Sequence, residues 1–92
     1  MTKYELIHKI TESTGFKRKD VLAIVEQLMV VVKDAVAEGD EVTLRGFGSF
    51  WRQHRDDYRH YAPGTIKLVP AHNEPRFKPS KKFKALLLKD GI

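Results

Sequence analysis

The sequence predicts an α+β fold in which two helices precede a β-hairpin with a long extended tip and a short terminal helix. Three observations lead to this prediction. Apolar residues recur at three- and four-residue steps as far as Glu38, the period changes to two after Gly39, and a basic run poor in apolar residues, Trp51 to Tyr61, follows a Gly-Phe-Gly turn. The 92 residues suit one domain, and because no cysteine is present, its stability must come from a hydrophobic core or from association.

The first helix should begin just after Thr2. Thr2 and Glu5 have the spacing of a capping box, in which the hydroxyl and the carboxylate each accept a hydrogen bond from an unpaired backbone amide. Leu6 and Ile7 would then fall on one side of the helix. Gly15 should end it, because glycine adopts the left-handed cap conformation without steric cost.

A second helix should run from Lys17 or Arg18 to Glu38, with Gly39 as its terminator. It has an apolar stripe at three- and four-residue steps and further apolar residues outside that stripe. This is more apolar surface than one small chain can bury alone, and it therefore suggests a dimer. The stripe contains Val21, Ile24, Val25, Leu28, Val32, Ala35 and Val36, while Leu22, Met29, Val30 and Val31 lie outside it.

The middle of the chain predicts a hairpin arm. Val42 and Leu44 alternate with polar residues, as in a strand, and the Gly-Phe-Gly sequence that follows predicts a tight turn. The run that starts at Trp51 can be extended but has no apolar face to lay on a core. A turn at 62–65 should lead into a returning strand. We therefore expect an arm of about residues 51–69 that projects into solvent.

Three prolines and a serine shape the last part of the chain. Because proline cannot donate a ladder hydrogen bond, Pro70, Pro75 and Pro79 should break the returning strand or confine it to a sheet edge. Ser80 should cap the terminal helix. The expected organisation is a single domain, 1–92, with a dimerising helical base (1–39), a β-region that includes the arm (40–79) and a C-terminal helix (80–92).

The net charge of +5 lies in the second half of the chain. Residues 1–50 carry seven Lys and Arg against eight Asp and Glu, whereas residues 51–92 carry ten against four. Six cations and no acid lie from Arg76 to Lys89. Such a cluster attracts phosphate backbones unless it is merely a solvated face, so it favours a nucleic-acid partner.

Catalysis and membrane insertion find no support in the sequence. Ser49 and Ser80 have no base at a readable spacing, there is no phosphate-binding glycine loop, and the adjacent Asp56 and Asp57 do not form a pair across a strand. No apolar run approaches a membrane span, and the first residues do not resemble a signal peptide. We therefore expect no enzyme, no cofactor and no membrane partner.

The histidines do not predict a metal site. Their spacing is not that of metal ligands, and no acidic partner recurs near them in the sequence. We expect solvated imidazoles or imidazoles close to a nucleic acid, and no bound metal, for His8, His54, His60 and His72.

Motifs in a fixed order span the whole chain. The most specific is Gly-Phe-Gly-Ser-Phe at 46–50, after a short strand and before a basic arm, followed by Pro-Arg-Phe-Lys-Pro at 75–79. Together with Arg55 and a long helix that ends in Glu-Gly, these motifs resemble the bacterial HU and IHF histone-like DNA-binding proteins. The resemblance implies an intertwined homodimer, or a heterodimer with a paralogous subunit, in which a helical base carries a β-saddle and two extended β-hairpin arms.

The family resemblance also implies a partner and a location. The arms of such a dimer would embrace the minor groove of double-stranded DNA and bend it. The protein would act in the bacterial cytoplasm, on the nucleoid. Within the arm, Tyr61 and Ala62 stand where family members usually have arginine and asparagine, whereas Pro63 keeps the place of the intercalating proline. Asp56 and Asp57 place negative charge midway along an arm that must approach phosphates.

The candidate DNA-binding residues are cations of the arm and of the last helix, together with glycines of the tight turn, whose amides can donate to phosphate. Plainer alternatives stay open: the arm cations could keep a hairpin soluble, Pro63 could form a turn rather than a wedge between base pairs, and Lys3 could be a solvated charge. The residues expected to bind DNA are Lys3, Arg45, Gly46, Gly48, Arg52, Arg55, Arg59, Tyr61, Pro63, Lys67, Arg76, Lys78, Lys81 and Lys82.

Apolar residues of the long helix, the strands and the last helix are expected to pack in the dimer. This predicted dimer core consists of Leu28, Val31, Val32, Leu44, Phe47, Phe50, Phe77 and Phe83.

The sequence therefore predicts an architectural protein that binds double-stranded DNA through its phosphates and minor groove, bends and compacts it, and discriminates little between sequences. Two alternatives stay open. One is an IHF-like factor that prefers particular sites. The other is a protein-interaction module that keeps the scaffold but contacts DNA weakly, which Asp56, Asp57 and an arm tip about two residues shorter than that of the family motivate.

Overall fold

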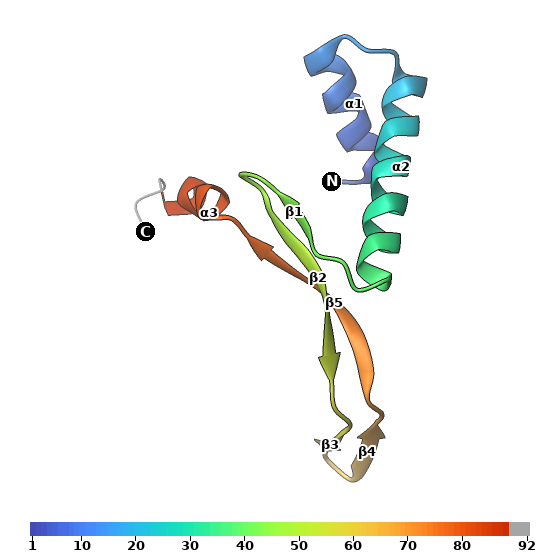
Figure 1. Cartoon of the computed structure of the whole chain (residues 1–92), viewed down its shortest axis with the longest axis vertical. Coiled ribbons are helices and arrows are strands. Elements are labelled where there is room, and N and C mark those ends of the chain that lie inside the picture. The colour runs from blue at the N-terminus through green and yellow to red at the C-terminus, as the bar shows by residue number, and fades with distance from the viewer. Residues whose placement is uncertain (89–92) are drawn as a thin grey trace. The chain divides into compact units, whose positions relative to one another are not determined.

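The computed structural model describes residues 1–88 and divides into two compact units, Met1–Asp34 and the chain from Ala35 onward. Its helices and strands confirm the predicted α+β class (Figure 1). Residues 89–92, which include Lys89 and the end of the predicted last helix, lie outside the described residues. In chain order the elements are α1 (Lys3–Thr14), α2 (Arg18–Ala37), β1 (Val42–Leu44), β2 (Gly48–Arg55), β3 (Tyr58–Ala62), β4 (Thr65–Val69), β5 (His72–Pro79) and α3 (Lys81–Leu88).

The helix ends in the first unit lie where the sequence predicts them. The Thr2 hydroxyl accepts a hydrogen bond from the Glu5 amide at 3.3 Å, at the start of α1. At the end of α1, Gly15 takes a φ of 75° and donates its amide to the Thr11 carbonyl at 2.9 Å. Helix α2 begins at Arg18, one of the two predicted starts. The N-cap and the glycine terminator of α1 are thus confirmed.

Helix α1 and the adjoining part of α2 lie side by side in the first unit (Figure 1). Ile7 of α1 is fully buried, and Val21 of α2 is only 3% exposed. Lys3 donates a hydrogen bond from Nζ to Oε1 of Glu26 at 3.0 Å. A small apolar contact and one ion pair therefore hold this helical hairpin together.

Helix α2 ends through a Schellman motif one residue before its predicted end. Gly39 has a φ of 95° and donates its amide to the Val36 carbonyl at 3.0 Å. The Asp40 amide donates to the Ala35 carbonyl at 2.9 Å. These two bonds satisfy carbonyl groups that the helix itself leaves unpaired.

Two apolar stripes run along α2, and one of them is exposed. Val21 and Val36 are buried, whereas Ile24, Leu28 and Val31 are 66%, 50% and 54% exposed. The predicted stripe at three- and four-residue steps thus contains both covered and exposed positions. A wide apolar arc contains more than one stripe at three- and four-residue steps, and spacing alone does not reveal which stripe is covered.

A three-stranded antiparallel sheet in the second unit has the order β1-β2-β5. A tight turn joins β1 to β2: the Phe47 amide donates to the Leu44 carbonyl at 2.9 Å, and Gly46 has a φ of 82°. Pro75 and Pro79 lie in β5, which pairs only with β2 and is therefore an edge strand. The predicted turn and the predicted edge position of the prolines are confirmed.

Strands β2 and β5 pair over their whole length and extend beyond β1. Trp51 lies opposite Arg76, and Arg55 lies opposite His72. The returning leg of the hairpin therefore includes β5 as well as β4. The hairpin thus continues past the predicted arm of about residues 51–69, and from here on "the arm" means residues 51–76, the hairpin between Trp51 and its partner Arg76.

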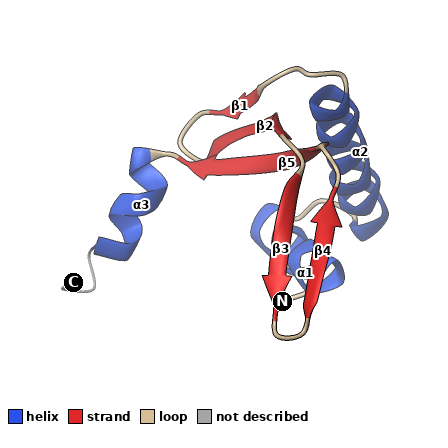
Figure 2. Ribbon diagram, turned by 90° about the horizontal axis from the view of Figure 1, so that it is seen from below, coloured by secondary structure: helices blue, strands red, loops and turns tan. Residues whose placement is uncertain are grey.

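The tip of the arm is a separate two-stranded ladder of β3 and β4 (Figure 2). Pro63 and Gly64 form the turn between these strands, and Gly64 has a φ of 80°. Asp56 and Asp57 interrupt the outgoing leg between β2 and β3, and Pro70 lies in the corresponding break of the returning leg. The arm thus consists of two ladders joined by short breaks.

Four phenylalanine rings cluster where α3 adjoins the sheet. The Phe47 ring lies 5.4 Å from that of Phe77 and 5.5 Å from that of Phe83, and the Phe50 and Phe77 rings are 4.7 Å apart, all between centroids. Ser80 caps α3, since its hydroxyl accepts a hydrogen bond from the Phe83 amide at 3.2 Å. The predicted cap is confirmed, and the cluster fixes the start of α3 against the β1–β2 turn.

All eight predicted dimer-core residues keep accessible surface in the single chain. Val32, Leu44, Phe50 and Phe83 are half-buried. Leu28, Val31, Phe47 and Phe77 are exposed.

Candidate nucleic-acid interface

The arm tip presents polar and apolar side chains on two exposed faces. Opposite residues of an antiparallel ladder share a face. Tyr61 lies opposite Ile66, and Arg59, two residues earlier, shares their face. Lys67 and His60 lie opposite each other on the other face. All of β3 and most of β4 are exposed, so the tip has no apolar body of its own to cover.

The turn at the far end of the arm exposes its proline. Pro63 lies between Ala62 and Gly64, and all three residues are exposed. Gly64 supplies the positive φ of the turn, and the Pro63 ring fixes φ at the position before it. An apolar ring at such a tip is available to a partner surface.

Arg52, a predicted DNA-binding residue, contacts the end of α2. Its Nη1 donates a hydrogen bond to the Ala37 carbonyl at 3.0 Å, and Nη2 lies close to Gly39. A cation at the C-terminal end of a helix is favourable because the last carbonyl groups lack partners there. Arg52 therefore has a structural contact, although a guanidinium has five N–H donors and only one is used in this bond.

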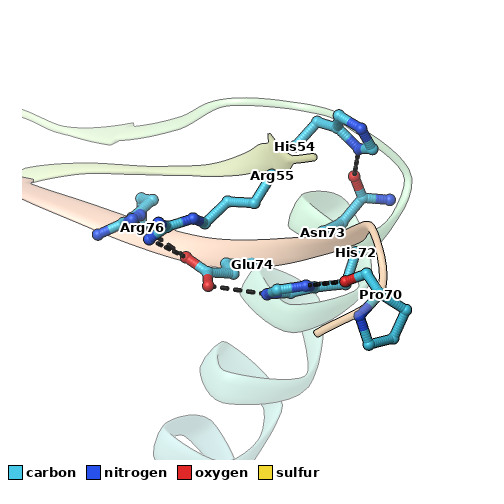
Figure 3. A network of polar contacts seen from close by, with 7 residues as sticks. All are labelled: His54, Arg55, Pro70, His72, Asn73, Glu74 and Arg76. Carbon is cyan, nitrogen blue, oxygen red and sulfur yellow. Dashed lines mark hydrogen bonds and ion pairs between the residues drawn. The ribbon is translucent and has the colours of Figure 1, made fainter. Parts of the chain in front are cut away.

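A cluster of charged side chains lies at the base of the arm, on β2 and β5 (Figure 3). Glu74 accepts at both carboxylate oxygens. Its Oε2 lies 3.1 Å from Arg76 Nη2 and 4.0 Å from Arg55 Nη1, and its Oε1 lies 2.9 Å from His72 Nε2. His72 Nδ1 lies 2.9 Å from the Pro70 carbonyl oxygen. Two predicted DNA-binding arginines thus have a carboxylate partner within the chain.

This cluster shifts the pKa of both titratable members. The hydrogen bond to the Pro70 carbonyl, and next the one to Glu74, raises the pKa of His72. The hydrogen bond from His72, aided by the charges of Arg55 and Arg76, lowers the pKa of Glu74. The arrangement therefore favours a charged carboxylate facing a charged imidazole.

The expectation that the histidines have no acidic partner is wrong. Besides His72, His54 Nε2 lies 3.2 Å from Asp56 Oδ1, and His8 Nε2 lies 3.0 Å from Glu12 Oε1. Residues two apart on a strand, or four apart on a helix, share a face, so the spacing alone could have revealed these pairs. Within residues 1–88, no three His, Asp or Glu side chains gather as a metal site would require.

A further group of predicted residues surrounds the β1–β2 turn and the start of α3. Gly46 supplies the positive φ of the β1–β2 turn. Gly48 is buried against β5, and its lack of a side chain lets the two strands approach each other closely. The cations of this group are exposed. They are Arg45, Lys78, Lys81 and Lys82.

Lys3 belongs to the first unit and already has a partner. Its hydrogen bond with Glu26 raises the pKa of the Lys3 amine, and its Nζ lies 5.1 Å from the centroid of the Tyr4 ring. No helix of the part that the structure describes combines the length and apolarity needed to cross a membrane. Among the predicted DNA-binding cations, those of the arm tip and those near α3 have no carboxylate partner within residues 1–88.

Comparisons with known proteins agree over almost the entire chain. The family model "Bacterial DNA-binding protein" matches residues 1–87. The chain is 40% identical over 86 residues to DNA-binding protein HU of Thermus thermophilus, covering 91% of this chain and 89% of that protein. It is 36% identical over 86 residues to HU of Thermotoga maritima, covering 91% and 96%.

Solved structures give the same result. An HU from Anabaena, in an HU–DNA cocrystal structure, superposes with a TM-score of 0.88 at 30% identity, covering 95% of this chain and 97% of that chain. HU from Thermotoga maritima superposes with a TM-score of 0.68 at 30% identity, covering 95% and 98%. The arrangement of helices and antiparallel hairpin strands is therefore similar in these proteins and in this chain.

Proposed function

Because the chain belongs to the bacterial DNA-binding protein family, which includes the HU proteins, we propose that it binds double-stranded DNA and bends it as an architectural protein. One observation carries this proposal. The arm is a two-ladder hairpin, basic overall, whose tip is exposed on both faces, and the chain that carries it superposes over 95% of its length with an HU from an HU–DNA cocrystal structure. A ribbon of this kind becomes well ordered by lying on a partner rather than on a core.

The chemistry of the arm suits a polyanion. Arg59 and Lys67 lie on opposite faces of the tip, so the ribbon meets negative charge on either side. Each phosphate that a cation neutralises releases condensed counterions, which favours binding without reading any base. Pro63 at the tip would wedge into a base step and kink the duplex, at a cost that wider contact offsets. We therefore propose low sequence discrimination.

The proposed active form is a dimer, either of two identical chains or with a paralogous subunit. The exposed stripe of Ile24, Leu28 and Val31 on α2 and the accessible phenylalanines Phe47 and Phe77 leave apolar surface that one chain does not bury. Burial of such surface contributes about 25 cal/mol per Å². Two subunits would place two arms on one duplex.

We place the protein in the bacterial cytoplasm, on the nucleoid, and assign it no catalytic step. Its curated relatives are named as DNA-binding proteins. A function in DNA packaging would require compaction of long duplexes by many bound dimers.

A gel-shift series with random-sequence duplexes over a range of salt concentrations tests the proposal. We expect binding at low salt that weakens linearly in log–log form as salt rises. A much higher affinity for one selected sequence at the same salt would favour a site-preferring factor. Failure to bind any duplex at low salt would overturn the proposal and favour a protein-interaction module.

A further inference from the structure

The base of the arm gathers three basic side chains around one carboxylate (Figure 3). Arg55 on β2 lies opposite His72 on β5, which puts both on one face of the ladder. Glu74 and Arg76 follow His72 at two-residue steps along β5 and therefore share that face. The carboxylate of Glu74 contacts all three basic groups, at 2.9 Å, 3.1 Å and 4.0 Å.

The imidazole of His72 is bound in a way that suits its charged form. Its Nδ1 faces the Pro70 carbonyl oxygen and its Nε2 faces a Glu74 oxygen, each at 2.9 Å. Both of these oxygens only accept hydrogen bonds, so a neutral imidazole, which has one N–H, satisfies one of them and an imidazolium satisfies both. In this charged form His72 is a third cation beside Arg55 and Arg76.

Three cations that converge on one carboxylate form the kind of cradle that also binds phosphate. Guanidinium groups pair with planar or tetrahedral oxyanions by the same charge-assisted hydrogen bonds. The site is open to solvent: the Glu74 side chain is 29% exposed, and the arginine side chains are 45% and 42% exposed. The 4.0 Å separation from Arg55 is long for a hydrogen bond, so the carboxylate satisfies this guanidinium incompletely.

We propose that Arg55, His72 and Arg76 form a phosphate-binding site for the DNA backbone, which Glu74 occupies in the free protein and vacates when duplex DNA binds. This inference rests on the proposed function and adds two residues to it. His72 becomes a ligand of the phosphate, and Glu74 becomes an internal competitor that lowers the affinity. The charged groups that face His72 are Glu74 on its own strand and Arg55 on β2, while Arg76 contacts the other oxygen of Glu74.

The first test compares Glu74→Gln with the native protein, using a random-sequence duplex and fluorescence anisotropy. The amide keeps the size of the side chain and one acceptor oxygen but removes the competing charge. We expect Glu74→Gln to bind about three- to fivefold more tightly at 50 mM salt, the scale of one exposed ion pair. Because Glu74→Gln raises the net positive charge that faces the duplex by one, this advantage should shrink about threefold between 50 and 200 mM salt.

Glu12→Gln is the matched control for that test. Glu12 is also a carboxylate bonded to a histidine, at 3.0 Å from His8 Nε2, but it lies on α1. Glu12→Gln removes the same charge from the protein as Glu74→Gln does, and we expect it to change the DNA affinity less than about twofold. If Glu74→Gln binds no more tightly than Glu12→Gln, the competitor role of Glu74 is overturned.

The second test follows the ring protons of His72 by NMR during pH titrations with and without the duplex. In the native protein DNA replaces one anion near His72 by another, so its pKa should change little. In Glu74→Gln the pKa should start lower and rise more strongly when DNA binds. Equal DNA-induced rises in both proteins would overturn the site, because the general field of DNA acts on both alike.

The outcomes separate this inference from the proposed function. A native protein that binds no duplex overturns the proposed function. A native protein that binds DNA, with Glu74→Gln unchanged in affinity and in the titration of His72, overturns only the phosphate site. Tighter binding together with the larger rise in the pKa of His72 supports both.

Discussion

A Cβ atom on Gly48 would lie only 2.5 Å from the carbonyl oxygen of Lys78 on the neighbouring strand. The same atom would lie 2.6 Å from the Phe77 ring. The nearest obstacle is backbone and cannot rotate away, so β2 and β5 approach each other at a separation that requires glycine. This close approach lies beside the phenylalanine cluster, at the end of β2 that adjoins the β1–β2 turn and is farthest from the arm.

Gly48→Ala should therefore destabilise the protein by about 2 kcal/mol, the usual cost of an atom forced into a filled space. Urea unfolding followed by circular dichroism measures this change. Ser49→Ala is the control: it removes only the exposed hydrogen bond to Thr43, so we expect a change within about 0.5 kcal/mol. Equal unfolding midpoints for the two variants would contradict the steric argument.

Lys81→Ala should reduce the salt dependence of DNA binding. If Lys81 at the start of α3 neutralises one phosphate, the slope of log affinity against log salt should fall in magnitude by about 0.9. Anisotropy titrations at four or five salt concentrations give the slope. Lys9→Ala on α1 serves as the control and should leave the slope unchanged; a similar loss there would mean that only total charge matters.

Pro63→Ala should diminish DNA bending more than DNA affinity. The substitution removes the apolar ring at the tip, while Gly64 keeps the positive φ of the turn. Fluorescence transfer between the labelled ends of a short duplex measures the bend, and anisotropy measures the affinity on the same sample. An unchanged end-to-end distance at saturation would refute the wedge assignment.

Val31→Asp should dissociate the dimer or unfold the protein. Val31 is 54% exposed in the single chain, so an aspartate there costs little until a second subunit covers it, and an unpaired buried charge is then expensive. Phe47→Asp should also dissociate the dimer or unfold the protein, because it places a charge in the phenylalanine cluster. Light scattering after size exclusion measures the molecular mass in solution. The control is Gln27→Asp, at a polar exposed position on α2, which should leave this mass unchanged. A Val31→Asp variant of native mass that binds DNA would place that residue outside the interface.

The arm base should be most stable between about pH 4.5 and about pH 6.5. Folding raises the pKa of His72, so protonated His72 stabilises the folded protein. This contribution is complete below the pKa of His72 in the unfolded chain and is lost as pH rises through its pKa in the folded protein. Folding lowers the pKa of Glu74, so ionised Glu74 also stabilises the folded protein. This contribution is present above the pKa of Glu74 in the unfolded chain and is lost as pH falls through its pKa in the folded protein. The difference in melting temperature between the native protein and a His72→Gln/Glu74→Gln variant should be largest in this window.

The helix ends and turns were predictable because each depends on a few neighbouring residues. Thr2 and Ser80 cap helices through their own hydroxyl groups, and Gly15 and Gly39 end helices through positive φ, whatever the rest of the chain does. The edge position of β5 followed from its prolines in the same way. Local chemistry thus sufficed for the helix ends, the turns and the edge position, but not for the break at Asp56 and Asp57 or for the length of β5.

The polar contacts of the arm base depend on strand register and were not predicted. Glu74 meets Arg55 only because β2 and β5 pair in one register, and Arg52 meets the Ala37 carbonyl across 15 positions of sequence. Burial on α2 likewise depends on which stripe a neighbour covers. Which of the predicted cations bind DNA stays a prediction, since it depends on a partner molecule.

Strand β5 has one unpaired border, and two of its eight residues, Pro75 and Pro79, have no N–H to offer a newcomer. A further strand that paired with this edge would lack backbone hydrogen bonds at the two prolines, so addition of a strand to the sheet is disfavoured. On a duplex that carries many copies of the protein, we expect the two prolines to disfavour a continuous sheet between neighbouring molecules.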